Sequence, residues 1–163
     1  MLIEGRTLGD AGLRLLLDAA FQEMVSRYGA EGRSGVHPDA RYLVALVDDQ
    51  PVGCGVVQPA GPTAGELKRM FVLPGHRGRG VARSLLRALE DLARALGYDV
   101  LRLATGVRQP EAIALYEASG FTSVPPYGKY VTDPLSRCYQ KPLSEHPHVP
   151  SPDDSPAQAT RHH

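Results

Sequence analysis

Apolar residues recur at helical spacing in three stretches of the chain. After Asp10, which can cap a helix, large apolar side chains lie three or four positions apart, and we expect this helix to end near Tyr28. A second stretch, roughly residues 80–96, carries a leucine stripe on one face and charged residues elsewhere. Pro110 begins a third helix, which Gly120 ends.

Shorter apolar runs between these stretches predict strands. A turn at residues 48–51 joins two of them in an antiparallel hairpin. The run after the second helix returns beside the run before it, and a right-handed crossover makes that pair parallel. The expected strands are 2–6, 42–47, 52–58, a strand beginning near Glu66, 98–105, 121–124 and 136–141. The pattern predicts an α/β fold with a mixed sheet.

Length and composition indicate a single domain whose net charge creates no strong electrostatic field. A length of 163 residues is ordinary for one domain, and 18 basic side chains balance 18 acidic ones, so charge recruits neither nucleic acid nor membrane. The N-terminus lacks a leader pattern, so we expect a cytoplasmic protein. From Ser144 onward Pro, Ser, Asp, Ala and His dominate. We therefore expect a domain over 1–143 and a disordered tail over 144–163.

Metal-ligand spacing is missing from the sequence. Cys54 and Cys138 lie far apart, outside any CxxC pair, and are best explained as small apolar residues. Four of the six histidines fall in the expected tail, where no scaffold would hold them around an ion. We therefore expect neither a disulfide framework nor a metal site.

Glycine and arginine alternate in the loop at residues 75–80, between an apolar strand end and the second helix. Such glycines allow successive backbone N–H groups to point into one concave space, and the helix N-terminus adds its own amides, which suits a diphosphate. A P-loop is excluded because Val81 and Ala82 stand where Lys and Ser/Thr are required. A dinucleotide fingerprint fails at Arg83, where a third small residue belongs.

Three motifs in order resemble the GCN5-related N-acetyltransferases (GNAT). Arg77, Gly80 and Ala82 match the acyl-CoA loop of that family. Residues 66–74 are similar to its fourth strand, and residues 111–121 to its later helix and strand. The resemblance covers about the central half of the chain and implies the GNAT fold, a mostly antiparallel sheet with one splayed parallel pair at the acyl-CoA site and helices on both faces.

The same resemblance implies acetyl-CoA as co-substrate, without a metal. Backbone groups of Phe71 and Val72 would pair with the pantetheine amides, and Gln109 stands where many relatives carry a cofactor-binding asparagine. The side chains of the three loop arginines either meet phosphate charge or form a solvated face. The amides expected to hold the diphosphate are those of Arg77, Gly78, Arg79, Gly80, Val81 and Ala82, and the arginines are Arg77, Arg79 and Arg83.

Two residues are candidates for proton transfer. Glu66 resembles the family's catalytic glutamate, which removes a proton from the amine directly or through water; the alternative is a structural carboxylate paired with Lys68 or Arg69. Tyr116 resembles the family tyrosine whose hydroxyl approaches the sulfur of coenzyme A and protonates or hydrogen-bonds the departing thiolate; the alternative is a packing residue. An acyl-cysteine route has less support, because neither cysteine is placed for activation.

We expect the acceptor to be a primary amine of a small molecule, with a protein or peptide acetyltransferase and a noncatalytic acyl-CoA-binding module as alternatives, and a homodimer as a possible assembly. Tyr127 and Tyr130, in a proline-rich loop, either contact this substrate or cover the core.

Overall fold

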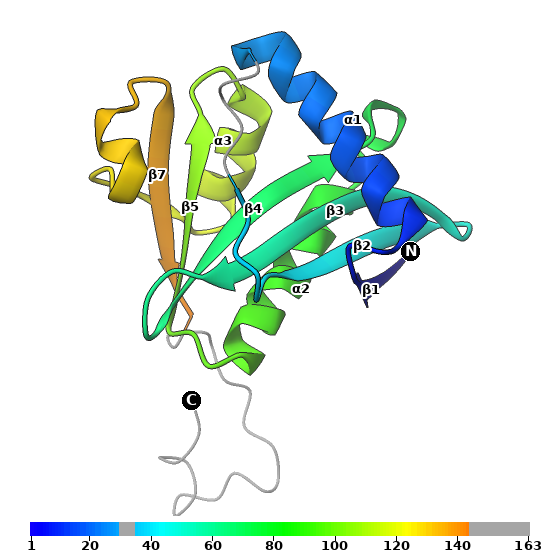
Figure 1. Cartoon of the computed structure of the whole chain (residues 1–163), viewed down its shortest axis with the longest axis horizontal. Coiled ribbons are helices and arrows are strands. Elements are labelled where there is room, and N and C mark those ends of the chain that lie inside the picture. The colour runs from blue at the N-terminus through cyan, green and yellow to red at the C-terminus, as the bar shows by residue number, and fades with distance from the viewer. Residues whose placement is uncertain (30–34, 144–163) are drawn as a thin grey trace, which may run out of the picture.

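A single sheet of seven strands, in the order β1-β2-β3-β4-β5-β7-β6, runs through the computed structural model, which describes residues 1–29 and 35–143 (Figure 1). The expected tail over 144–163 lies outside the described residues. The strands are β1 (Leu2–Arg6), β2 (Arg41–Val47), β3 (Gln50–Pro59), β4 (Ala64–Val72), β5 (Val100–Gly106), β6 (Thr122–Val124) and β7 (Ser136–Pro142). The helices are α1 (Ala11–Tyr28), α2 (Val81–Ala95) and α3 (Pro110–Ala118), with short 3-10 helices η2 (Pro74–His76) and η3 (Gly128–Thr132).

Local chemistry explains where several elements begin and turn. The Asp10 carboxylate accepts a hydrogen bond from the Leu13 backbone N–H at 2.8 Å, which caps α1 as predicted. Asp48 and Asp49 both have positive φ, 51° and 64°, and form the two-residue turn between β2 and β3. That turn type matches the twist of the strands it joins.

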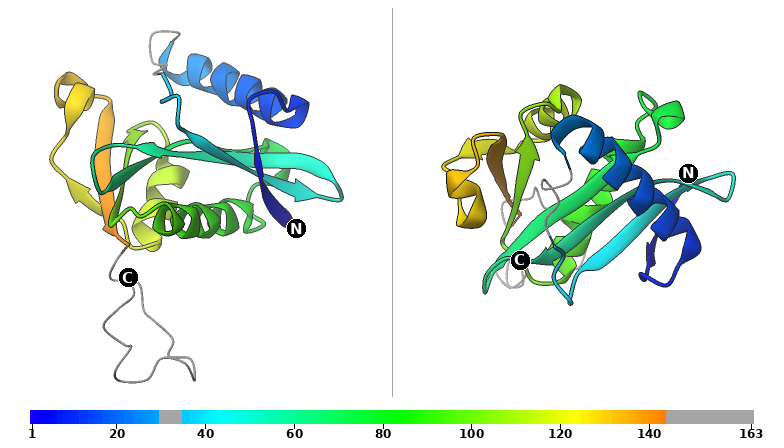
Figure 2. Two further views of the ribbon diagram at one scale, coloured as in Figure 1. Left: turned by 60° about the horizontal axis from the view of Figure 1, so that its bottom comes forward. Right: turned by 45° about the horizontal axis from the view of Figure 1, so that its top comes forward.

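Helices cover both faces of the sheet, as expected from the sequence (Figure 2). On one face, Leu13 and Leu16 of α1 are fully buried against β2, β3 and β4. On the other face, Leu89 of α2 packs in one cluster with Tyr116 of α3 and Phe121. The core therefore consists of two layers, with the sheet between them.

The parallel pair β4 and β5 is hydrogen-bonded over only part of its length. Ala64–Leu67 pair with Val100–Leu103, and beyond these residues the two strands diverge. In β4 the divergence begins beside a bulge, where Arg69 has a φ of 58° and β4 loses regular pairing with β3 opposite Gly55. A side chain at Gly55 would collide with the ends of the Leu89 and Met70 side chains, so glycine allows their close approach to the strand. This confirms the predicted splay.

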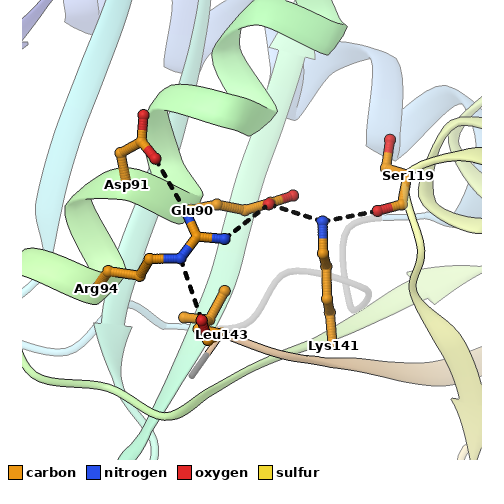
Figure 3. Close-up of polar contacts among 6 residues, drawn as sticks. All are labelled: Glu90, Asp91, Arg94, Ser119, Lys141 and Leu143. Atoms are coloured by element: carbon orange, nitrogen blue, oxygen red, sulfur yellow. Dashed lines mark hydrogen bonds and ion pairs between the residues drawn. The ribbon is translucent and has the colours of Figure 1, made fainter. Parts of the chain in front are cut away.

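A cluster of charged residues around the buried Glu90 lies between α2 and β7 (Figure 3). The Glu90 side chain is only 7% exposed and accepts a hydrogen bond from Lys141 Nζ at 2.8 Å. Lys141 Nζ also donates to the Ser119 carbonyl at the end of α3, at 2.8 Å. Arg94 completes the cluster by donating from Nε to the Leu143 carbonyl at 3.2 Å. The cluster thus joins α2, α3 and β7.

Candidate active site

A cavity of about 1160 Å³ lies where β4 and β5 diverge, bordered by α1, the loop after β4 and α3. Of the candidate site residues, Arg79 is exposed and is not part of the lining. The candidates that do line the cavity are Glu66, Phe71, Val72, Arg77, Gly78, Gly80, Val81, Ala82, Arg83, Gln109 and Tyr116.

The glycine loop presents its backbone to this cavity. Gly78 and Gly80 have φ values of 77° and 83°, in the left-handed region, and Gly80 caps the N-terminus of α2. Around both glycines the space for a Cβ atom is open, so backbone conformation, and not crowding, is what favours glycine. Val81 and Ala82 begin α2 at the cavity wall, where first-turn amides lack helical partners. The loop can therefore hold an anion by backbone N–H groups.

The exposed Arg77 side chain is bonded to two neighbouring parts of the protein. Its Nε donates to the Val72 carbonyl at 2.8 Å, and its Nη2 donates to Glu23 Oε1 at 2.8 Å. The guanidinium also lies over the Phe71 ring, 5.6 Å from its centroid. These contacts connect the loop to the end of β4 and to α1.

A second connection joins α1 to the loop after β5. The Arg108 backbone N–H donates to Tyr28 Oη at 2.8 Å, and Arg108 Nη1 donates to the Arg27 carbonyl at 2.8 Å. A side chain at Gly106 would collide with Tyr28 Oη, so this contact depends on glycine. The C-terminal part of α1 therefore contacts both arms of the splayed pair.

Glu66 is buried, with 9% of its surface exposed, and both carboxylate oxygens have donors. Gln58 Nε2 donates to Oε1 at 3.1 Å, and Tyr130 Oη donates to Oε2 at 3.1 Å. Gln58 is itself oriented, because its Oε1 accepts from the His37 backbone N–H at 2.8 Å. Neutral donors from β3 and η3 thus fix the position of this carboxylate at the cavity wall.

Tyr116 lies on α3 with 6% of its surface exposed, and its ring meets Phe121 edge-on at 5.8 Å between centroids. Burial raises the pKa of its hydroxyl well above the usual value. The phenol therefore stays protonated at neutral pH, which is the form a proton donor needs. It both packs in the core and lines the cavity, so the two interpretations of this residue are compatible.

The two loop tyrosines differ in position. Tyr130 lines the cavity, whereas Tyr127 is not among the lining residues and its buried hydroxyl has no hydrogen-bond partner within the described part of the chain. Their rings pack edge-on, 5.5 Å apart between centroids. Tyr130 is thus the one of the pair that is placed to meet a ligand.

In the described part of the chain, neither the buried Cys54 thiol nor a metal-binding group adds to the candidate chemistry. Burial raises the pKa of the Cys54 thiol to about 12, so it holds little thiolate at neutral pH. Residues 1–29 and 35–143 contain no group of three or more side chains suited to hold a metal ion. Over the same ranges, no helix combines the length and apolar character needed to span a bilayer.

Several contacts of the site had no counterpart in the sequence analysis. Gln58, Glu23 and Tyr28 carry no motif. Gln58 lies opposite Glu66 in the pairing of β3 with β4, whereas Glu23 and Tyr28 meet their partners because distant segments fold together. Glu23 and Arg77 are 54 positions apart, and Tyr28 and Arg108 are 80 apart. No local spacing could have indicated these pairs.

Comparison with known proteins agrees with this architecture. The model of the acetyltransferase (GNAT) family matches residues 11–121, and the chain belongs to this family of acyltransferases. It is 48% identical to an IAA acetyltransferase from Azospirillum brasilense over 107 residues, which cover 65% of this chain and 70% of the relative. The resemblance drawn from the three motifs is thereby confirmed.

Solved structures show the same fold. A Klebsiella pneumoniae protein assigned to the acyl-CoA N-acyltransferases superposes with a TM-score of 0.75 at 34% identity, over 87% of this chain and 97% of that one. A GNAT acetyltransferase from Elizabethkingia anophelis, solved with acetyl-CoA bound, has a TM-score of 0.66 at 18% identity, over 86% of this chain and 97% of that one.

Proposed function

We propose that the protein is an N-acetyltransferase that transfers an acetyl group from acetyl-CoA to the primary amine of a small molecule by direct attack in a ternary complex. The observation that carries this proposal is the cavity at the splay, whose walls hold the glycine loop, Glu66 and Tyr116 together. The name of the Azospirillum brasilense relative adds support for a small-molecule acceptor.

The residues at the splay fit acetyl-CoA, which supplies the reactive thioester when bound. The left-handed glycines Gly78 and Gly80 and the first turn of α2 offer backbone N–H groups to the diphosphate. Beyond Leu67, β4 is no longer paired with β5, so the backbone near Phe71 and Val72 has an edge to which the pantetheine can add like a strand. Gln109, at the start of α3, lines the same cavity.

Glu66 acts as the general base in this proposal. An alkylamine with a pKa near ~10 is almost wholly protonated at neutral pH, and it must lose a proton before it can attack. The carboxylate takes that proton directly or through one water. Gln58 and Tyr130 hold both of its oxygens in place, each at 3.1 Å, while the amine approaches.

Tyr116 acts as the general acid. When the C–S bond breaks, its neutral hydroxyl supplies a proton to the sulfur, and the proton taken by Glu66 later returns to solvent. A thiolate is less basic than a phenolate, so the Tyr116 hydroxyl stabilises the departing sulfur by donating a hydrogen bond or its proton, and a phenolate formed in this way regains a proton from solvent.

The test is acetyl-CoA-dependent thiol release across a panel of amines, amino acids and peptides, with product masses checked for one added acetyl group. We expect turnover on a small-molecule class, and a large loss of that turnover in Tyr116→Phe with acetyl-CoA affinity retained. Binding of acetyl-CoA without turnover on any acceptor would refute the proposal in favour of a noncatalytic module. Turnover on peptides alone would replace the small molecule with a polypeptide.

A further inference from the structure

The side chains of β5 alternate between the two faces of the sheet. Leu103 packs in the cluster that contains Tyr116 of α3, so Thr105, two positions further along the strand, faces the same side. Gly106 faces the opposite side, where the Tyr28 hydroxyl of α1 approaches it. Thr105 therefore lies on the same face of the sheet as the proposed general acid.

Thr105 is a buried polar residue of the cavity wall. Only 8% of its surface is exposed, and it lines the same cavity as Tyr116. Within residues 1–29 and 35–143, its hydroxyl has no hydrogen-bond partner, and it is not sealed inside the protein as the Tyr127 hydroxyl is. Buried polar side chains normally have a partner, so a ligand that enters the cavity can supply the missing hydrogen bond.

Thr105 also lies where the gap between β4 and β5 begins. Leu103 is the last residue of β5 that pairs with β4, opposite Leu67. Two positions beyond Leu67, β4 reaches Arg69 and its irregular pairing with β3. Thr105 and the unpaired edge of β4 therefore border the same gap, which the pantetheine fills in the proposed complex.

The proposed base lies on the other face of the sheet. Val57 of β3 and Leu67 of β4 pair with each other and pack in the same cluster as Tyr116. The next pair, Gln58 and Glu66, therefore faces α1. Because the amine must reach Glu66 in the proposed reaction, it approaches from the α1 side of the sheet. The ligand group nearest Thr105 thus belongs to the cofactor and not to the acceptor.

We propose that Thr105 is a cofactor-binding residue whose hydroxyl hydrogen-bonds the pantetheine amide next to the sulfur of acetyl-CoA. This inference rests on the acetyltransferase function above and adds a residue to its cofactor site. Pantetheine that pairs with β4 along one edge presents its other side to β5, and a threonine hydroxyl can donate to an amide carbonyl or accept from an amide N–H. Since Tyr116 meets the sulfur on this face, the adjacent amide is the next polar group within reach of the same wall.

The first test measures binding without turnover. In Thr105→Val, which keeps the shape of the side chain but lacks the hydroxyl, we expect the Kd for coenzyme A in titration calorimetry to rise by about fivefold or more. The Kd for adenosine bisphosphate, the nucleotide part of coenzyme A without pantetheine, should stay at the wild-type value. The contrast between these two ligands assigns the loss to the pantetheine arm.

Further variants separate the hydroxyl from packing. Thr105→Ser keeps the hydroxyl and should bind coenzyme A within about twofold of the wild type. Thr105→Ala removes both the hydroxyl and the methyl group and should bind as weakly as Thr105→Val. Thr122→Val is the matched control, since Thr122 is exposed on β6 and outside the cavity lining, and it should leave both Kd values unchanged.

Three outcomes would overturn the inference. An unchanged Kd for coenzyme A in both Thr105→Val and Thr105→Ala would show that the hydroxyl makes no contact with the cofactor. An equal rise for coenzyme A and adenosine bisphosphate, or weak binding by Thr105→Ser, would assign the effect to the shape of the pocket. All three leave the acetyltransferase function intact, because that function is judged by turnover. A wild-type protein that binds coenzyme A but acetylates no amine would refute the acetyltransferase function alone.

Discussion

The two ends of the cavity are built in different ways. At the glycine loop, the backbone of Gly78, Gly80, Val81 and Ala82 faces the cavity as the candidate anion site, with Gly78 and Gly80 in the left-handed region. Two residues differ from the expectation, because Arg79 is outside the lining and the Arg77 backbone N–H donates to the Pro74 carbonyl at 3.4 Å. At the other end, Glu66 is held by Gln58, eight positions earlier, and by Tyr130, 64 positions later. One end depends on local backbone conformation, and the other on side chains assembled by the tertiary fold.

This difference predicts that substitutions at the two ends of the cavity change different quantities. A change at the loop should alter the affinity for acetyl-CoA and leave the rate at saturation intact. A change at the Glu66 end should alter the rate of the chemical step and leave that affinity intact. The variants below test this separation, beginning with the largest expected effect.

Glu66→Gln keeps the shape of the side chain but removes the proposed base. We expect kcat to fall by about 100-fold or more, since general base catalysis commonly contributes that much. The Kd for acetyl-CoA, measured by titration calorimetry, should stay at the wild-type value. An equal loss in kcat and in cofactor affinity would show that the two ends are coupled.

Glu90→Gln tests whether stability can be lost without affecting either end. The substitution removes the carboxylate that faces Lys141 and Arg94, and we expect the free energy of unfolding in urea to fall by about 2 kcal/mol. Asp91→Asn is the control, because that side chain is 75% exposed and its ion pair with Arg94 should contribute little. A changed kcat in Glu90→Gln at a temperature where it is folded would contradict the expected independence.

Gly80→Ala acts at the loop through backbone strain. A Cβ there meets open space, but a φ of 83° costs a non-glycine residue about 1 kcal/mol. We expect the Kd for acetyl-CoA to rise by about fivefold, with kcat at saturation unchanged. Gly75→Ala is the matched control in the same segment, since its Cβ also meets open space and its φ lies outside the left-handed region. A similar rise in Kd for both variants would refute the argument from strain.

Tyr130→Phe removes one of the two donors to Glu66 and leaves the ring in place. The lost hydrogen bond should lower kcat by a factor of about three to ten, without an effect on the Kd for acetyl-CoA. Tyr127→Phe is the control, because that buried hydroxyl has no hydrogen-bond partner within the described residues. Equal loss of activity in the two variants would mean that η3 acts through packing alone.

The same contrast explains what the sequence could predict. Helical and strand periodicity located the elements to within a few residues, and the left-handed glycines at 78 and 80 could be anticipated from loop spacing. The position of β7 between β5 and β6 was not predicted, because pairing order depends on contacts across the whole sheet. Nor were two of the contacts at the site, because Tyr130 lies 64 positions from Glu66 and Glu23 lies 54 positions from Arg77, and no local pattern indicates such pairs.

Helix α1 also has a mechanical role. Near its C-terminal end, Glu23 binds Arg77 on the loop after β4, and Tyr28 binds the Arg108 backbone on the loop after β5. The helix therefore links the ends of β4 and β5, which at this point no longer hydrogen-bond to each other. The separation of β4 and β5 is thus held by a helix that lies outside the sheet. A residue of this helix, remote from the reacting atoms, can therefore set the width of the gap that the substrates must share.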